Sequence, residues 1–346
     1  WRDDDHRAAF EAFISSAPAV LAGSTKSTGL RDAARAALDA SARGLVSSSS
    51  ARIFFEDHFA PHRITVSGQP GLLTGYYEPE LTGSLRRTPK FRVPVLARPA
   101  DLINLVDESQ RGALSERLTH ARLTTDGSID AYFTRQEIEE GALDGLGLEI
   151  AYVADPVDLF LMQVQGSGLI RLEDGSAIRL SYAGKNGHPY SSLGRHLIET
   201  GVFTAQTMNL ASLAEWLKAD PDRARSLLWR NKSYVFFRVL GSKRQTQVLG
   251  TDLIPLVPLR SLAVDTGYHD LGLPVYVSAP TLDHVPISTP RFQRLMVAHD
   301  VGSAIKGPER GDLFCGSGAE AGAKAGMIKH PVRFFPLLPK KVGEGE

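Results

Sequence analysis

The chain has 346 residues, and its Lys and Arg side chains balance its Asp and Glu side chains at 39 each. A chain of this length buries a sizeable core and suffices for about two domains. The balanced charge and the lack of a long basic run exclude the electrostatic footprint of a nucleic-acid binder. A largely uncharged polymer remains compatible as a partner.

The single cysteine, Cys315, excludes a disulfide within the chain. It fits a small buried apolar residue better than a reactive thiol. No apolar stretch approaches the roughly 18 residues of a membrane-spanning helix. Residues 1–6 begin without Met and lack the basic and apolar regions of a signal peptide, so we expect either a trimmed chain or a mature form, without any export signal or anchor that the precursor had.

The first 60 residues carry helical patterns. Asp3–Asp5 stand before a helix start, where acidic side chains are favourable. The Ala-rich range 30–43 ends at Gly44, a helix stop. The serine run 47–50 is consistent with either a helix start or a loop.

From residue 63 onward, short runs of Val, Ile, Leu, Tyr and Phe alternate with Gly, Pro, Asn and Asp. Many short strands between turn signals are typical of β-barrels rather than of a parallel α/β sheet. The expected strands are 72–77, 93–97, 148–153, 159–165, 234–240, 274–278, 295–298 and 333–338.

Helices interrupt these strands. The capping-box sequence 134–137 predicts a short helix to about residue 143. Ranges 192–200 and 210–229 have helical spacing, and Pro221 breaks the second range. The predicted fold class is therefore α+β, mainly β.

Several chemistries find no support in the sequence. The glycines of 166–168 lack the third glycine of a dinucleotide fingerprint, and the following 173–176 is a hairpin turn between two strands. The stretch 302–307 lacks the spacing of a P-loop. The ten histidines show no H-E-x-x-H pattern or paired metal spacing, and no G-x-S-x-G elbow is present. We therefore predict no metal and no cofactor.

Three aspartates near the C-terminal end, Asp265, Asp300 and Asp312, each border a short apolar run beside Gly or Thr. Carboxylates at strand ends, held by a rigid sheet, suit acid–base chemistry. They also suit the capping of turns by accepting backbone N–H bonds. Both interpretations stay open on the residues alone.

The C-terminal region resembles the three-aspartate (3D) domain, a double-psi β-barrel shared in outline with barwin, expansins and one group of endoglucanases. The upstream region resembles the MltA family of membrane-bound lytic murein transglycosylases. The motifs that carry this resemblance occur in the family's order between about residues 70 and 340. They are Leu73–Pro79, Met162–Gly168, Ser181–His188 and Asn231–Phe237, followed by Leu295–Gly307 and Gly311–Gly322.

The resemblance implies a two-domain fold. Residues 1–82 together with 201–346 would form the double-psi β-barrel domain, with the 3D segment at about 255–340. Residues 83–200 would form an inserted second β-barrel domain facing it across a groove.

The resemblance also implies an activity: cleavage of the bond between N-acetylmuramic acid and N-acetylglucosamine in peptidoglycan, giving 1,6-anhydromuramyl ends. Asp312 matches the family's catalytic aspartate, and Asp300 and Asp265 are expected to position it and tune its pKa. The expected substrate-binding residues are Tyr76, Tyr77, Gln163, Gln165, Ser167, Tyr182, Lys185, Asn186 and His188.

By the same resemblance, we expect a monomer in the periplasm, associated with the outer membrane, that acts on peptidoglycan glycan strands and has room for complexes with wall-synthesis enzymes. Two other functions remain in view. One is a glycan hydrolase that uses Asp312 as acid and Asp265 or Asp300 as second carboxylate. The other is a non-catalytic cell-wall-binding module.

Overall fold

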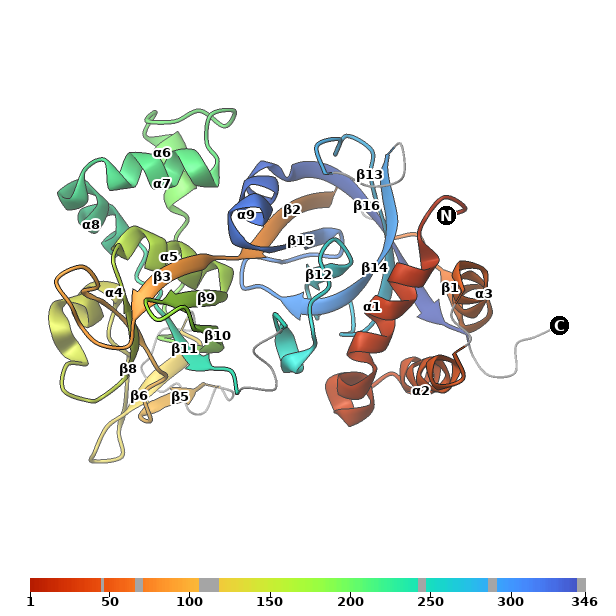
Figure 1. Cartoon of the computed structure of the whole chain (residues 1–346), viewed down its shortest axis with the longest axis horizontal. Helices are drawn as coiled ribbons and strands as arrows, with labels where there is room; N and C mark the ends of the chain where they lie inside the picture. The colour runs from red at the N-terminus through yellow and green to blue at the C-terminus, as the bar shows by residue number, and fades with distance from the viewer. Residues whose placement is uncertain (45–46, 66–70, 106–117, 242–246, 286–290, 341–346) are drawn as a thin grey trace. The chain divides into compact units, whose positions relative to one another are not determined.

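The structure is a computed structural model that describes residues 1–44, 47–65, 71–105, 118–241, 247–285 and 291–340 (Figure 1). Contacts between residues divide the chain into two compact units. The first unit joins Trp1–Tyr77 to Gln247–Glu346, and the second unit is the continuous stretch Glu78–Thr246. The second unit is thus an insertion between the two segments of the first.

The return to the first unit comes later than expected. The insert was expected to end at residue 200, whereas residues 201–246 also belong to the second unit. The reason is strand pairing: β11 (Val235–Val239) pairs antiparallel with β10 (Ala177–Lys185). A boundary at residue 200 would divide this ladder and separate backbone groups that need each other as hydrogen-bond partners.

A closed β-barrel forms the centre of the first unit. Among the described residues its strands follow the order β16, β13, β14, β12, β15 and β2, and β2 pairs back onto β16. Closure of this kind leaves no sheet edge within the ring. The bounds are β2 Gly71–Glu78, β12 Ser261–Val264, β13 Pro274–Ala279, β14 Phe292–Val301, β15 Arg310–Ser317 and β16 Lys329–Pro339; β1 (Phe59–Pro61) pairs with the end of β16.

Strands β12 and β14 run parallel, whereas β12 and β15 run antiparallel. The register pairs Ser261 with Val297, and a shift follows between Leu262 and Ala263. On the other side of β12, Ala263 lies opposite Asp312. The barrel thereby sets β15, and with it Asp312, in a defined register.

The N-terminal helices pack on this barrel: α1 (His6–Ala19) against β14, α2 (Thr28–Ala42) against β16 and α3 (Ser48–His58) against β1. The side chains of Asp5, Ser27 and Ser47 accept hydrogen bonds from the first turns of the three helices in that order. The serine run at 47–50 is therefore a helix start.

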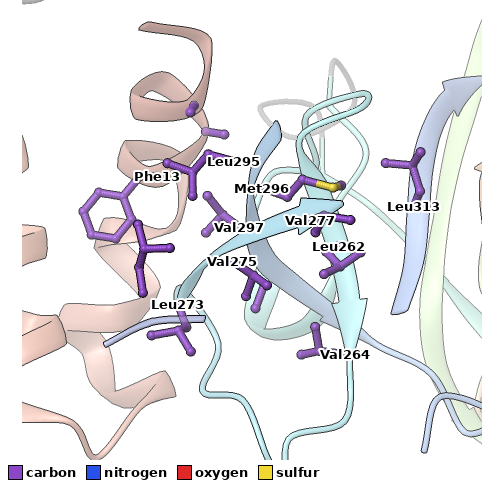
Figure 2. Close-up of a cluster of buried hydrophobic side chains, with 14 of the residues drawn as sticks. Phe13, Leu262, Val264, Leu273, Val275, Val277, Leu295, Met296, Val297 and Leu313 are labelled. Carbon is purple, nitrogen blue, oxygen red and sulfur yellow. The ribbon is translucent and has the colours of Figure 1, made fainter. Parts of the chain in front are cut away.

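Strand β14 is buried on both faces. Figure 2 shows Phe13 of α1 beside Leu295 and Val297, while Met296 lies toward Leu262 on the other face. All five are essentially inaccessible to solvent. Alternate residues of a strand point to opposite faces, so an unbroken apolar run is expected where both faces are covered. Each such side chain contributes about 1.5–3 kcal/mol through its burial.

The second unit contains a six-stranded sheet among its described residues, in the order β11, β10, β9, β3, β8 and β4. A bridge between Ala97, just after β4, and Phe237 in β11 connects the two ends of this sheet. The remaining bounds are β3 Glu80–Ser84, β4 Val93–Leu96, β8 Glu149–Val153 and β9 Ser167–Leu172, with β5 Leu102–Asn104, β6 His120–Leu123 and β7 Ile129–Asp130 in a separate small sheet. The expected α+β class, mainly β, with an inserted barrel domain is confirmed.

Helices of the second unit pack around α5. Their bounds are α4 Arg135–Glu137, α5 Pro156–Gln165, α6 Leu193–Glu199, α7 Leu210–Lys218 and α8 Pro221–Arg230. The capping box at residues 134–137 and the break at Pro221, which begins α8, are both confirmed.

One expected strand is wrong. Residues 159–165 lie in α5, where Asp155 caps the first turn, Pro156 opens the helix and Gly166 ends it with φ +81°. The apolar run is too short for its periodicity to distinguish a strand from a buried helix. The hairpin at residues 173–176 is confirmed, because β9 and β10 pair antiparallel on either side of it.

Asp4 and Arg260 form a buried ion pair that fastens the N-terminal segment to the barrel. The guanidinium donates to both carboxylate oxygens, at 3.0 and 2.9 Å, and the Leu295 amide donates to Asp4 at 2.6 Å. Both side chains are 3% exposed or less.

In the part of the chain that the structure describes, no helix has the length and apolarity to span a membrane.

We expect Arg260→Met to lower the free energy of unfolding by about 3–5 kcal/mol, because it leaves the Asp4 carboxylate buried without its cation. Chemical denaturation measures this. Arg35→Met is the matched control: its ion pair with Asp32 is about 60% exposed on both sides and should cost less than about 1 kcal/mol. Equal losses in the two variants would contradict the role of the buried pair.

Candidate functional site

Asp312 lies inside β15 rather than at the strand end expected from the sequence. Its neighbours Gly311 and Leu313 are buried, and Asp312 itself is partly buried. A Cβ on Gly311 would come within 2.6 Å of the Phe334 ring, so only glycine permits this close approach of β15 to β16. The carboxylate is thus carried by a strand packed tightly into the barrel wall.

Burial raises the pKa of Asp312 to about 6, and the nearby charge of Asp300 acts in the same direction. The hydrogen bond from Thr74 and the guanidinium of Arg310 act against that rise. Thr74 Oγ1 donates to Asp312 Oδ1 at 2.7 Å. One carboxylate oxygen therefore has a fixed donor, and the group is poised to carry a proton near neutral pH.

Asp300 in β14 is surrounded by hydrogen-bond donors. Its Oδ1 accepts from the Thr251 amide at 3.0 Å, the Thr251 hydroxyl at 2.9 Å and the Val301 amide at 2.9 Å. Its Oδ2 accepts from the Tyr76 hydroxyl at 3.0 Å. Burial raises the pKa of Asp300, whereas these donors act to lower it.

Asp265 has a different environment. Its Oδ2 accepts from the Gly307 amide at 2.8 Å and its Oδ1 from the Gly267 amide at 3.1 Å. These amides, together with the Lys306 ammonium, hold the pKa of Asp265 below its usual range. These are the contacts of a turn-forming carboxylate, the second of the two interpretations that the sequence left open, and the expected tuning role of Asp265 stays a prediction.

The structure thus brings Asp300 and Asp312 within electrostatic range of each other, and strand β2 serves both. Thr74 and Tyr76 are two residues apart, so they share a face of β2. The Tyr76 ring is buried against Phe314 at 5.3 Å between centroids, and burial raises the pKa of its hydroxyl well above 10. The Tyr76 ring is thus buried and its hydroxyl is bonded to Asp300, and its expected role in binding substrate stays a prediction.

Tyr77 packs against α9 (Gly318–Met327), the helix that follows β15. A Cβ on Gly322 would lie 2.7 Å from the Tyr77 ring, which shows how closely the ring and the helix meet. The sequence left core packing and ligand binding open for Tyr77. Its contacts in the first unit are those of a packing residue.

Among the expected binding residues of the second unit, Asn186 is a structural amide. It is fully buried, and its Nδ2 donates to the Phe133 and Lys232 carbonyls at 2.8 Å each. Its Oδ1 accepts from the Tyr234 amide at 2.9 Å. The Asn186 amide therefore makes three hydrogen bonds to the backbone, and its expected role in binding substrate stays a prediction.

Gln163 and His188 are also engaged with backbone carbonyls. Gln163 is 3% exposed and donates from Nε2 to the Val235 carbonyl at 3.1 Å. His188 Nε2 lies 2.8 Å from the Tyr132 carbonyl. Gln163 thus ties helix α5 to strand β11, and His188 ties its loop to the segment at Tyr132.

The other expected residues differ in exposure. Ser167 is buried at the start of β9, and Gln165 and Lys185 are partly buried at the ends of α5 and β10. Tyr182 in β10 is 42% exposed. Of the expected binding residues, Tyr182 presents the most accessible aromatic surface for a sugar ring.

The described residues hold no cluster of His, Cys, Asp or Glu suited to a metal ion. Residues that sequence reasoning missed are Thr74, Thr251 and Arg310. Thr74 had a signal, since it lies two residues before Tyr76 in a family motif. Thr251 had none, because only the fold brings it to Asp300.

Two family models match the chain. The MltA specific insert domain matches residues 72–238, and the 3D domain matches residues 260–338. The first match covers most of the second unit, and the second includes Asp265 and the strands that carry Asp300 and Asp312.

Known proteins resemble the chain over most of its length. The crystal structure of a membrane-bound lytic murein transglycosylase from Agrobacterium tumefaciens is 36% identical, covers 98% of this chain and 94% of that chain, and has a TM-score of 0.87. Escherichia coli MltA with bound chitohexaose is 27% identical, with 97% and 90% covered and a TM-score of 0.70. The expected double-psi barrel with an inserted barrel domain is thereby confirmed.

A curated relative, membrane-bound lytic murein transglycosylase A of Vibrio cholerae, is 38% identical over 207 residues. This alignment covers 59% of the present chain. The chain spans little more than half of that relative, 55% of its length.

We expect Thr74→Val to raise the pKa of Asp312 by about one, because a hydrogen bond to a charged carboxylate contributes about 1.5 kcal/mol. Titration of 13C-labelled aspartate carboxyls by NMR measures this value. Thr74→Ser keeps the hydroxyl and should leave the pKa near that of the unsubstituted protein. A valine variant with an unchanged pKa would show that the hydroxyl does not stabilise the carboxylate.

We expect Asn186→Ala to lower the free energy of unfolding of the second unit by about 2–3 kcal/mol, since it leaves buried backbone groups without partners. Thermal and chemical unfolding measure this. Tyr182→Phe, which changes an exposed residue of the same strand region, should stay within about 0.5 kcal/mol of the unsubstituted protein. A fully stable Asn186→Ala protein would show that these hydrogen bonds do not stabilise the second unit.

Proposed function

The chain belongs to the MltA family, and on that premise we propose that it is a lytic transglycosylase of peptidoglycan with Asp312 as its single acid and base. The proposed substrate bond is the β-1,4 link between N-acetylmuramic acid and N-acetylglucosamine. The observation that carries the proposal is the placement of Asp312 in strand β15, where its Oδ1 accepts from Thr74 at 2.7 Å. Burial at this position raises the pKa of Asp312 to about 6. That arrangement leaves Oδ2 as the oxygen that carries the proton.

The reaction balances without water. Asp312 gives its proton to the glycosidic oxygen, the bond between this oxygen and C1 of the muramyl sugar breaks, and the N-acetylglucosamine hydroxyl leaves. The C6 hydroxyl of the same muramyl sugar then attacks C1, and its proton passes to the Asp312 carboxylate. The product is a 1,6-anhydromuramyl end, and the acid is regenerated. An intramolecular nucleophile explains why one carboxylate suffices.

The surroundings of the other aspartates support one acid rather than two. A hydrolase needs a second carboxylate directed at water or at the sugar. Both oxygens of Asp300 accept hydrogen bonds from the protein, and both oxygens of Asp265 accept backbone N–H groups. Their engagement supports a positioning role for Asp300 and a turn-forming role for Asp265, and it disfavours the two-carboxylate alternative.

A glycan substrate is supported by similarity to the Escherichia coli protein whose structure holds chitohexaose. Within the second unit, Tyr182 is the proposed stacking residue and Gln165, Ser167 and Lys185 the proposed polar contacts. Lys185 would suit the carboxylates of the peptide stems. We further propose a periplasmic, outer-membrane-associated location, following the naming of the relatives as membrane-bound. We also propose that the enzyme is a monomer.

We expect the protein to release soluble anhydromuropeptides from purified sacculi and Asp312→Asn to release none, a loss of at least about 1,000-fold, since general acid catalysis contributes about 100- to 10,000-fold. Mass spectrometry identifies the products, because each anhydro end is one water lighter than a hydrolysed end. Hydrated reducing ends would assign the chain to the hydrolases. If both proteins bind sacculi and neither releases soluble muropeptides, the chain is a non-catalytic wall-binding module.

We expect kcat/KM to fall as pH rises through about 6, because ionisation of Asp312 removes the acid.

The folded-state pKa of Asp312 lies above the ordinary value for Asp, so burial of the carboxylate costs stability progressively as pH rises from about 4 to about 6. Asp312→Asn should therefore melt at a higher temperature than the unsubstituted protein at pH 7. Calorimetry checks this, and a lower melting temperature would show that the substitution damages the fold.

A further inference from the structure

The turn Gly250–Leu253 presents Thr251 to Asp300 with backbone and side chain together. The Thr251 amide and hydroxyl both donate to Asp300 Oδ1, at 3.0 and 2.9 Å. A single residue thus supplies two donors to one oxygen of a buried carboxylate. Neither donor takes part in the chemistry assigned to Asp312.

This turn is held in an unfavourable conformation. Asp252 and Leu253, both non-glycine residues, have φ of 53° and 61°, values that L residues seldom adopt. The Gly250 amide donates to the Ile254 carbonyl at 2.9 Å, and the Ile254 amide donates to the Thr251 carbonyl at 3.1 Å, which closes the turn. Strained residues of this kind persist where the surrounding structure forces them, and they concentrate at functional sites.

Gly250 brings the turn into direct contact with Asp300. A Cβ at this position would lie 2.7 Å from the His299 carbonyl oxygen and 3.0 Å from Asp300 Cγ. No larger residue permits the turn to approach so closely. The close approach of Gly250 thus accompanies the two hydrogen bonds from Thr251 to Asp300.

The donors at Asp300 favour its charged form. Three N–H or O–H groups donate to Oδ1. If Asp300 were neutral, its proton would have to lie on Oδ2, which already accepts a hydrogen bond from the Tyr76 hydroxyl. Burial favours the neutral form and raises the pKa of Asp300, so removal of a donor tips the balance toward protonation.

We propose that Thr251 is a positioning residue that keeps Asp300 a fixed carboxylate, and that this charge in turn holds the proton on Asp312. The inference rests on the proposed function in its claim about catalysis. The other titratable groups that face this pair are Tyr76 on β2, and Arg310 and Cys315 on β15. None of them contacts Thr251 by a hydrogen bond among the described residues.

The test compares Thr251→Val, Thr251→Ser, Asp300→Asn and the double variant Thr251→Val with Asp300→Asn. Each protein receives two measurements: the pH profile of kcat/KM on soluble glycan strands, and the titration of 13C-labelled Asp312 by NMR. We expect Thr251→Val to move the alkaline limb and the Asp312 titration to lower pH, because a neutral Asp300 no longer opposes ionisation of Asp312. Thr251→Ser keeps the hydroxyl, so its pH profile and its Asp312 titration should match those of the unsubstituted protein.

The double variant decides whether Thr251 acts through Asp300. It should match Asp300→Asn in both measurements, since no charge remains for Thr251 to stabilise. Thr200→Val, which removes an exposed hydroxyl bonded to the His196 carbonyl, is the matched control and should leave the profile unchanged. A valine variant that loses activity equally at every pH, or a double variant whose shifts add, would overturn the proposal.

The NMR titration separates this inference from the proposed function. If the protein releases no anhydromuropeptides but Thr251→Val still lowers the Asp312 titration, the proposed function fails and the electrostatic link stands. If anhydromuropeptides form and the titration does not move in Thr251→Val, the link fails and the function stands. Should Thr251→Val not fold, Gly250→Ala perturbs the same contact, and an unmoved titration there would also overturn the link.

Discussion

Closure of the barrel by β2 is the constraint on which the rest of this protein depends. The strand comes from residues 71–78, yet it completes a ring whose other members all lie beyond residue 260. Its pairing with β16 and β15 leaves Thr74 and Tyr76 on one face, where they meet Asp312 and Asp300. A strand with one register sets both contacts at once, because a slip by one residue would turn these side chains to the opposite face.

The same strand leads directly into the second unit, which begins at Glu78. Glu78 is fully buried and forms an ion pair with Arg179 at 2.8 Å. Thr74, Tyr76 and Glu78 are alternate residues of β2. The first two bond to carboxylates of the first unit, and Glu78 pairs with a cation of the second unit. Burial of such polar groups costs free energy unless each one has a hydrogen-bond or ion-pair partner. The partners of these three side chains therefore fix the register of β2.

Two buried carboxylates in one barrel need different surroundings to perform different tasks. Asp300 meets many donors and is suited to a fixed charge, whereas Asp312 has the Thr74 hydroxyl on one oxygen and a pKa raised to about 6. Different surroundings give neighbouring carboxyl groups different pKa values, so that one can act as the acid while the other stays charged. Asp265, bonded to backbone amides, contributes to the turn that precedes β13.

The sequence by itself determined seven of the eight strands it predicted, the capping box at residues 134–137, and the family motifs that single out Asp312. It mistook α5 for a strand, since a short apolar run has no decisive period. Only the tertiary structure decided that Thr74 reaches Asp312 across 238 residues, that Thr251 serves Asp300, and that Asn186 is a structural amide. The reason is physical: local pattern sets which residues form a strand, whereas barrel closure and pairing register set which distant donors meet a buried carboxylate.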